Sequence, residues 1–328
     1  MNRREVIHAL LAVAAATEPL RTFAQSRRGK VMRVGALFLV SAANVILPPL
    51  LPAALRKLGW IEGQNLLFDR RFGDGRLTEL PRLASELVQL NPDVIVVQTN
   101  LEAQAVLRAT NTIPIVVAVA FDPVGSGFAQ TLAHPGGSVT GFVYPEPAFV
   151  AKMVQFLFEA VPTVRRLGLV YDPRIPGTET YIDADQRAAE AAHVEVRRLP
   201  VRGAEDIATA LAMIEKEHVD ALKIAPGGAV AIGISAILAF AAERRLPTAW
   251  GLPDPVERGG LLSYAPNIAE LFGRVADFVD RILKGAKPAD LPFEHPTRFE
   301  LTLNLKTAKA LGIKIPQSVL LRADRLIE

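Results

Sequence analysis

The sequence predicts an α/β protein with two doubly wound parallel-sheet lobes joined by a hinge. Three observations predict this fold class. Short apolar runs, typical of strands buried on both faces, alternate with longer amphipathic segments after residue 30. The alternation forms two successive series of similar length, which meet just after the Pro-Gly-Gly turn at residues 135–137. Polar residues recur directly after the apolar runs, where the strand ends of an open parallel sheet face a cleft.

The first series, residues 31–141, is expected to form the amino-terminal lobe. Pro52 should delay the start of its first helix, since proline inside a helix removes a hydrogen bond. Asn100 should cap the third helix. Strands are expected at residues 31–40, 66–72, 93–98, 113–120 and 138–143, and helices at residues 46–58, 80–90, 101–109 and 124–133.

The second series, residues 142–267, is expected to form the carboxy-terminal lobe. Asn267 should cap a long return helix over residues 268–283, and Gly285 should stop it. The whole tail, residues 268–328, should pack across both lobes and help to complete the first. Strands are expected at residues 167–171, 194–200, 221–225, 247–251, 260–264 and 299–305, and further helices at residues 149–161, 179–192, 204–217, 230–244 and 305–311.

Residues 1–24 have the form of a secretory signal peptide. Arg3 and Arg4 give a charged start, residues 7–16 form a short apolar core, and residues 22–24 give a small-x-small cleavage site. The arginine pair fits both the general secretory and the twin-arginine route. The chain has no cysteine, so neither a lipid anchor nor a disulfide is expected. No apolar stretch reaches about 18 residues, and we therefore expect a periplasmic protein whose mature form does not insert into the membrane.

Composition and motifs favour a binding protein over an enzyme. The net charge is +3 and basic residues do not cluster, which argues against a nucleic-acid partner. Gly125-Ser126-Gly127 begins a dinucleotide-like pattern, but Gln130 stands where the third glycine is required. Phosphate-loop, H-E-x-x-H and G-x-S-x-G motifs are absent from the sequence. We expect no cofactor, no metal and no catalytic residue.

Polar and aromatic residues that follow predicted strands are the candidate ligand-binding residues. Hydroxyls and amides in such loops can hold the polar ends of a solute, while aromatic rings cover its apolar part. A buried carboxylate such as Asp122 could meet an ammonium group. Structural roles compete: Asn100 and Asn267 as helix caps, Asp122 as a turn former, and the aromatic residues as core. The candidates are Ser41, Asn44, Gln98, Thr99, Asn100, Asp122, Tyr171, Asp172, Trp250, Tyr264 and Asn267.

Motifs along nearly the whole chain resemble those of one family, the exported substrate-binding proteins of ABC transporters, which includes tryptophan- and tyrosine-binding members. The leader is similar to the family's M-x-R-R-E-F-I start. Residues 58–65 resemble L-G-Y-x-E-G-x-N, residues 71–75 R-W-A-E-G, residues 122–124 D-P-V, residues 134–141 R-P-G-G-N-V-T-G, residues 263–267 S-Y-G-P-[ND], residues 282–291 I-L-K-G-A-K-P-A-D-L, and residues 304–311 N-L-K-T-A-K-A-L.

The resemblance implies a type I periplasmic-binding fold whose cleft closes on a small ligand, with ABC permease membrane subunits as partners. It marks Asp122, Tyr264 and Asn267 as motif positions. The chain departs from the family at the proposed site, because residues 98–100 replace the usual T-G-G and residues 172–173 replace N-P. The identity of the ligand therefore does not follow from the resemblance.

The leading hypothesis is an exported receptor that binds a small organic solute, such as an amino acid or an aromatic compound, and does not alter it. A periplasmic sensor subunit that acts on a membrane kinase or another regulatory partner is the alternative. A secreted enzyme that uses Asp122 with Asp172 is a third interpretation.

Overall fold

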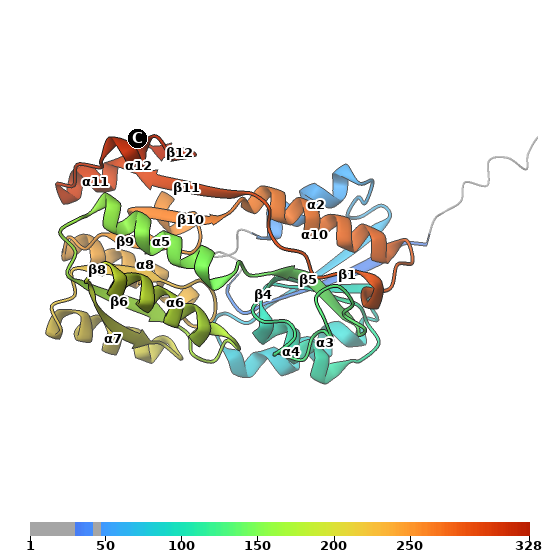
Figure 1. The fold of residues 1–328 in the computed structure, drawn as a ribbon. Coiled ribbons are helices and arrows are strands. Elements are labelled where there is room, and N and C mark those ends of the chain that lie inside the picture. Colours follow the sequence, from blue (N-terminus) through green and yellow to red (C-terminus); the bar gives the residue numbers. More distant parts are fainter. Residues whose placement is uncertain (1–29, 42–46) are drawn as a thin grey trace, which may run out of the picture. The chain divides into compact units, whose positions relative to one another are not determined.

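The computed structural model describes residues 30–41 and 47–328, and residues Met32–Glu328 form one compact unit with two β-sheets (Figure 1). The first sheet has the order β2-β1-β3-β4-β5, and every pair of neighbours is parallel. Its strands are β1 (Met32–Phe38), β2 (Leu66–Phe72), β3 (Val94–Val97), β4 (Ile115–Ala120) and β5 (Val139–Val143).

The second sheet has the order β12-β11-β10-β9-β8-β6-β7. Its neighbours are parallel except for β10 and β11, which run antiparallel. The strands are β6 (Arg166–Tyr171), β7 (Glu195–Pro200), β8 (Ala221–Ile224), β9 (Thr248–Trp250), β10 (Leu262–Pro266), β11 (Phe299–Asn304) and β12 (Arg325–Ile327).

Helices cover both faces of each sheet, which confirms the predicted fold class. In Figure 1, α2 and α10 lie on one side of the first sheet and α3 and α4 on the other. The helices are α2 (Leu47–Lys57), α3 (Leu80–Gln89), α4 (Asn100–Ala109), α5 (Pro147–Ala160), α6 (Thr178–Ala191), α7 (Ala204–Lys216), α8 (Val230–Glu243), α9 (Asp254–Glu257), α10 (Ile268–Leu283), α11 (Leu305–Leu311) and α12 (Gln317–Leu320).

The continuous apolar runs of the strands are explained by this double coverage. In β3, Val94 and Val96 pack against the cluster that contains α10, while Ile95 and Val97 pack against the cluster that contains α3 and α4. All four side chains are buried. Burial of each large apolar side chain contributes about 1.5–3 kcal/mol, so both faces must be apolar.

The tail, residues 268–328, contributes elements to the packing of both sheets. Helix α10 begins where predicted, at Ile268, because the Asn267 side chain accepts a hydrogen bond from the Glu270 backbone N–H. Its apolar face, which includes Val275 and Phe278, lies in the core beside the first sheet. Strands β11 and β12 then extend the second sheet.

Two predictions about helices were wrong in the first series. The segment 124–133 forms turns instead of a helix. The Ser126 N–H donates to the Asp122 carbonyl, as in an α-helix, but the next N–H, of Gly127, donates to the nearer Val124 carbonyl. Gly127 also has a φ of +74°, which is not a helical angle. Helix α2 runs from Leu47 with Pro52 in its interior.

The cap of α4 also differs from the prediction. Thr99, not Asn100, precedes the helix, and it forms a capping box with Glu102. The Asn100 side chain instead accepts a hydrogen bond from the Phe121 N–H at 2.8 Å and donates to the Phe121 carbonyl at 2.6 Å. Asn100 therefore ties the start of α4 to the loop after β4.

Candidate functional site

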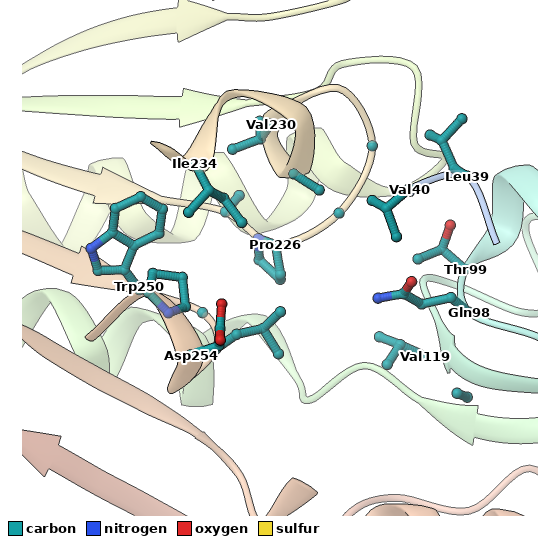
Figure 2. Close-up of a pocket in the computed structure, with 18 of the residues that line it drawn as sticks. Leu39, Val40, Gln98, Thr99, Val119, Pro226, Val230, Ile234, Trp250 and Asp254 are labelled. Atoms are coloured by element: carbon teal, nitrogen blue, oxygen red, sulfur yellow. The ribbon is translucent and has the colours of Figure 1, made fainter. Parts of the chain in front are cut away.

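A pocket opens where strands of both sheets end at their carboxyl sides (Figure 2). We call it the main chamber. Its volume is about 90 Å³. One water molecule requires only about 10–15 Å³, so the chamber has room for a larger molecule. From the first sheet it is lined by Leu39, Val40, Gln98, Thr99, Ala118 and Val119, and from the second by residues 224–228, 250–252 and 254–255, with Val230, Ala231, Ile234, Glu102, Ile268, Leu271 and Phe272 from helices.

A second chamber, of about 40 Å³, adjoins the first. The two chambers share lining residues from both sheets, including Gln98, Val119, Pro226 and Gly227. The second chamber extends to Phe121 and Tyr144, and we call it the aromatic chamber. The two chambers together form one cleft with mainly apolar walls, as is usual for small-molecule sites.

An aromatic cluster backs the aromatic chamber. The Phe121 and Tyr144 rings lie 4.4 Å apart between centroids, and Tyr181 packs edge-on to both at 5.6 and 5.0 Å. Burial raises the pKa of Tyr181 to about 12 and raises the pKa of Tyr144 far above its ordinary value. Both phenols are therefore neutral at physiological pH, and this wall of the cleft carries no charge.

Glu102 fixes the first-sheet wall of the main chamber. Its carboxylate is buried and accepts hydrogen bonds from the Leu39 N–H at 2.9 Å, the Thr99 N–H at 3.0 Å and the Thr99 hydroxyl at 2.6 Å. Burial raises the pKa of Glu102, and the hydrogen bonds from Thr99 and Leu39 oppose that shift. The side chain thereby joins the end of β1 to the start of α4.

Asp172 fixes the second-sheet side of the cleft in the same way. The side chain is fully buried and accepts from the Ala229 N–H at 2.8 Å. It also accepts from the backbone N–H of Arg174 at 2.9 Å and from its guanidinium at 3.0 and 2.8 Å. A Cβ on Gly228 would lie 2.3 Å from Asp172 Oδ2, so the loop between β8 and α8 needs glycine to wrap around this carboxylate.

Two polar side chains face the main chamber from opposite sides. In Figure 2, Gln98 lies on the first-sheet side and Asp254 on the second-sheet side. The Asp254 side chain is 34% exposed, and Oδ2 lies 3.5 Å from the Arg258 guanidinium. Our sequence reasoning missed Asp254 because it lies four residues beyond the end of β9. The signal that could have found it is the acidic start of α9 after Pro253.

Residues 51–327 match the family described as "ABC transporter substrate binding protein". The chain belongs to this family. Among solved structures, a conserved domain protein from Vibrio cholerae is 29% identical with a TM-score of 0.83, and the match covers 90% of this chain and 100% of the other. An ABC domain from Streptococcus pneumoniae in complex with L-Trp is 26% identical with a TM-score of 0.83, over 90% and 99% of the two chains.

A curated relative, the tyrosine-binding protein of Clostridioides difficile, is 22% identical over 261 residues, which are 80% of this chain and 75% of that protein. These likenesses confirm the family resemblance that the motifs predict. Among the described residues of this substrate-binding protein, no group of three or more His, Asp or Glu side chains could hold a metal ion. The described helices include none long and apolar enough to cross a membrane.

Three of the eleven candidate residues line the cleft of this substrate-binding protein: Gln98, Thr99 and Trp250. The Thr99 hydroxyl is engaged by Glu102. The Trp250 ring is buried, its Nε1 donates to the Thr248 hydroxyl at 2.8 Å, and in Figure 2 the indole extends away from Gln98. Only Gln98 of these three thus presents a free polar group to the main chamber in the arrangement shown.

Asp122 differs from the expectation of a buried carboxylate. The residue is exposed, has a φ of +41°, and its Oδ1 accepts from the Gly125 N–H at 2.9 Å. It therefore forms the turn after β4 and lines neither chamber. Of the remaining candidates, Ser41, Asn100, Tyr171, Asp172, Tyr264 and Asn267 also lie outside the two chambers, and Asn44 lies outside the described residues.

Tyr264 and Asn267 make contacts within the fold and do not line the two chambers. The Tyr264 ring stacks on Phe149 at 5.3 Å and packs near Phe299 at 5.9 Å. Asn267 caps α10 and lines a separate polar groove that also contains Asp254. Tyr264 lies within β10, and Asn267 directly precedes α10, so both residues of this motif make contacts that stabilise the fold.

Proposed function

We propose that this protein binds one small, mainly apolar organic solute in the two-chamber cleft and delivers it unaltered to an ABC permease in the membrane. The observation that carries this proposal is the lining of the cleft, to which both sheets contribute carboxyl-end residues such as Gln98 and Pro226. Such strand ends are the usual ligand site of open α/β sheets. The bound L-Trp of the Streptococcus pneumoniae relative supports an aromatic compound or an amino acid as the solute.

The mechanism is closure of the cleft on the solute. A ligand that contacts Val119 from the first sheet and Gly227 from the second stabilises the arrangement in which both walls meet it. No bond of the solute is made or broken. Small-angle scattering should show compaction when the solute binds.

Export to the periplasm is part of the proposal, with cleavage of the leader near Ala24. The charged start, the apolar core and the small-x-small end of residues 1–24 support it. Amino-terminal sequencing of the protein recovered from a periplasmic extract tests it, and an uncleaved leader on the recovered protein would contradict it.

A solute screen by thermal unfolding tests the binding function. At a hundredfold excess over its Kd, a ligand adds about 2.7 kcal/mol to the free energy of unfolding, so at least one solute should raise the Tm. Val119 lines both chambers, and Val119→Trp should fill the cleft and abolish the rise.

The matched control for this screen is Val124→Trp. Val124 is 45% exposed and lines neither chamber, so this variant should keep the ligand-induced rise in Tm. The proposal fails if no solute of a broad metabolite library shifts the wild-type Tm, or if the shift persists in Val119→Trp.

A further inference from the structure

Three helices of ten or more residues begin at the cleft, and at each start a side chain of the protein accepts a backbone N–H hydrogen bond. Free backbone N–H groups at a helix start attract anions. At α4 the carboxylate of Glu102 accepts from the Thr99 N–H, and at α8 the carboxylate of Asp172 accepts from the Ala229 N–H. At α10 the Asn267 side chain fills the same role. At each of these three ends one backbone N–H is thus already bonded to a side chain of the protein.

The side chains that line the cleft are unsuited to an anion. Among the described residues, those that line the two chambers include no lysine, arginine or histidine. The charged side chains that do line the main chamber are Glu102, which is buried and saturated with donors, and Asp254. Asp254 is the more exposed carboxylate.

Asp254 also belongs to a second hollow, the polar groove outside the main chamber. Glu257, Glu300 and Arg325 line that groove with it. Glu257 pairs with Arg325 at 2.5 Å. Each of the three carboxylates has an arginine beside it: Arg258 at Asp254, Arg325 at Glu257 and Arg298 at Glu300. The groove is therefore close to neutral, and attraction of a cation depends on Asp254 itself, because Arg258 lines neither chamber.

We propose that the ligand is an apolar molecule that carries an ammonium group and no carboxylate, such as an arylalkylamine. The ammonium lies at Asp254, and the ring lies in the cleft toward the aromatic chamber and Phe121. This inference rests on the proposed function and narrows it. It separates this protein from the relative in complex with L-Trp, because a zwitterionic amino acid would bring its carboxylate to walls that offer carboxylates and no cation.

Calorimetric titration at neutral pH with three indole compounds tests the inference. Tryptamine, L-tryptophan and indole-3-propionate share one ring and differ in their charged groups. We expect tryptamine to bind at least tenfold more tightly than tryptophan, and indole-3-propionate to bind most weakly. Asp254→Asn should reduce the affinity for tryptamine by roughly 10- to 100-fold, the range for loss of a hydrogen bond to a charged group, and should remove the preference for the amine.

The matched control is Glu257→Gln, a neighbouring carboxylate that lines the groove but neither chamber. Its affinity for tryptamine should stay within about twofold of wild type, in line with the small energies of exposed charges. Equal or tighter binding of tryptophan or indole-3-propionate overturns the inference, as does an unchanged tryptamine affinity in Asp254→Asn.

If none of the three compounds binds, the charged groups of the ligand found in the solute screen test the inference. A ligand with a free carboxylate, or one without an amine, overturns the inference and leaves the proposed function intact. An amine without a carboxylate whose affinity falls in Asp254→Asn supports it. A screen without any ligand overturns the proposed function itself.

Discussion

Replacement of Lys223 by methionine is expected to lower the free energy of unfolding by about 3–5 kcal/mol, the range for removal of one partner of a buried ion pair. Lys223 Nζ lies 2.5 Å from Asp185 Oδ2, and the two side chains are 1% and 0% exposed. Among described residues the Asp185 oxygens have no other hydrogen-bond partner. Without Lys223 the carboxylate is buried and unpaired. Urea unfolding measures the loss.

Two further variants give this experiment its controls. The double variant Asp185→Leu with Lys223→Met should recover most of the stability, because an apolar pair of similar volume carries no desolvation cost. Lys284→Met removes an exposed partner of Asp280, where the lysine side chain is 63% exposed, and should cost less than about 1 kcal/mol. A loss in Lys223→Met no larger than in Lys284→Met would contradict this account of the pair.

The loss of stability in Lys223→Met is expected to depend on pH in one direction. Burial raises the pKa of Asp185 in the folded protein, and Lys223 opposes the shift. A carboxyl with a higher pKa in the folded than in the unfolded state binds its proton more tightly when folded, so its contribution to stability falls as pH rises through the folded pKa. Removal of Lys223 should raise that pKa further. The stability deficit of Lys223→Met should therefore shrink as pH is lowered, and a pH-independent deficit would contradict it.

Substitution of Gly141 by alanine should also cost about 3–5 kcal/mol or prevent folding. Gly141 has a φ of +147°, and a Cβ there would lie 2.0 Å from the Val117 carbonyl oxygen in the neighbouring strand β4. Backbone strain of this kind costs about 1–3 kcal/mol, and a clash with backbone atoms adds to it because a paired strand cannot move aside easily. Thermal and urea unfolding measure the effect.

Gly127→Ala is the matched control. Gly127 also has a positive φ, +74°, but a Cβ there meets no atom within 4 Å. It should therefore show only the conformational cost of about 1–2 kcal/mol. Equal losses in the two variants would mean that the contact with Val117 is not the reason why β5 requires glycine.

The elements that the sequence predicts best are those whose signal is local. The run from Ile268 to Leu283 carries an amphipathic period, an asparagine cap and a glycine stop, and the helix has these limits. The segment 124–133 has a similar side-chain bond at its start, from the Gly125 N–H to Asp122, but the glycines at 125 and 127 favour turns. Buried strands such as β3 are predictable because both faces are apolar over their full length.

The candidate site was harder to predict, because its geometry depends on contacts between distant parts of the chain. Position after a strand selects Gln98 correctly as a residue that lines the cleft, but it also selects Asp172. That carboxylate turns to the Ala229 N–H, 57 residues away in sequence. Glu102 bonds to the Leu39 N–H across 63 residues. Such pairings have no local signal, so a sequence pattern does not separate a cap from a ligand contact.

The structure of the protein crystallised with the tightest-binding solute tests the central claim most directly. The account predicts one solute molecule in the two-chamber cleft, in contact with Gln98 from the first sheet and with Pro226 or Gly227 from the second. A solute bound outside this cleft, or one that touches residues of a single sheet only, would contradict it.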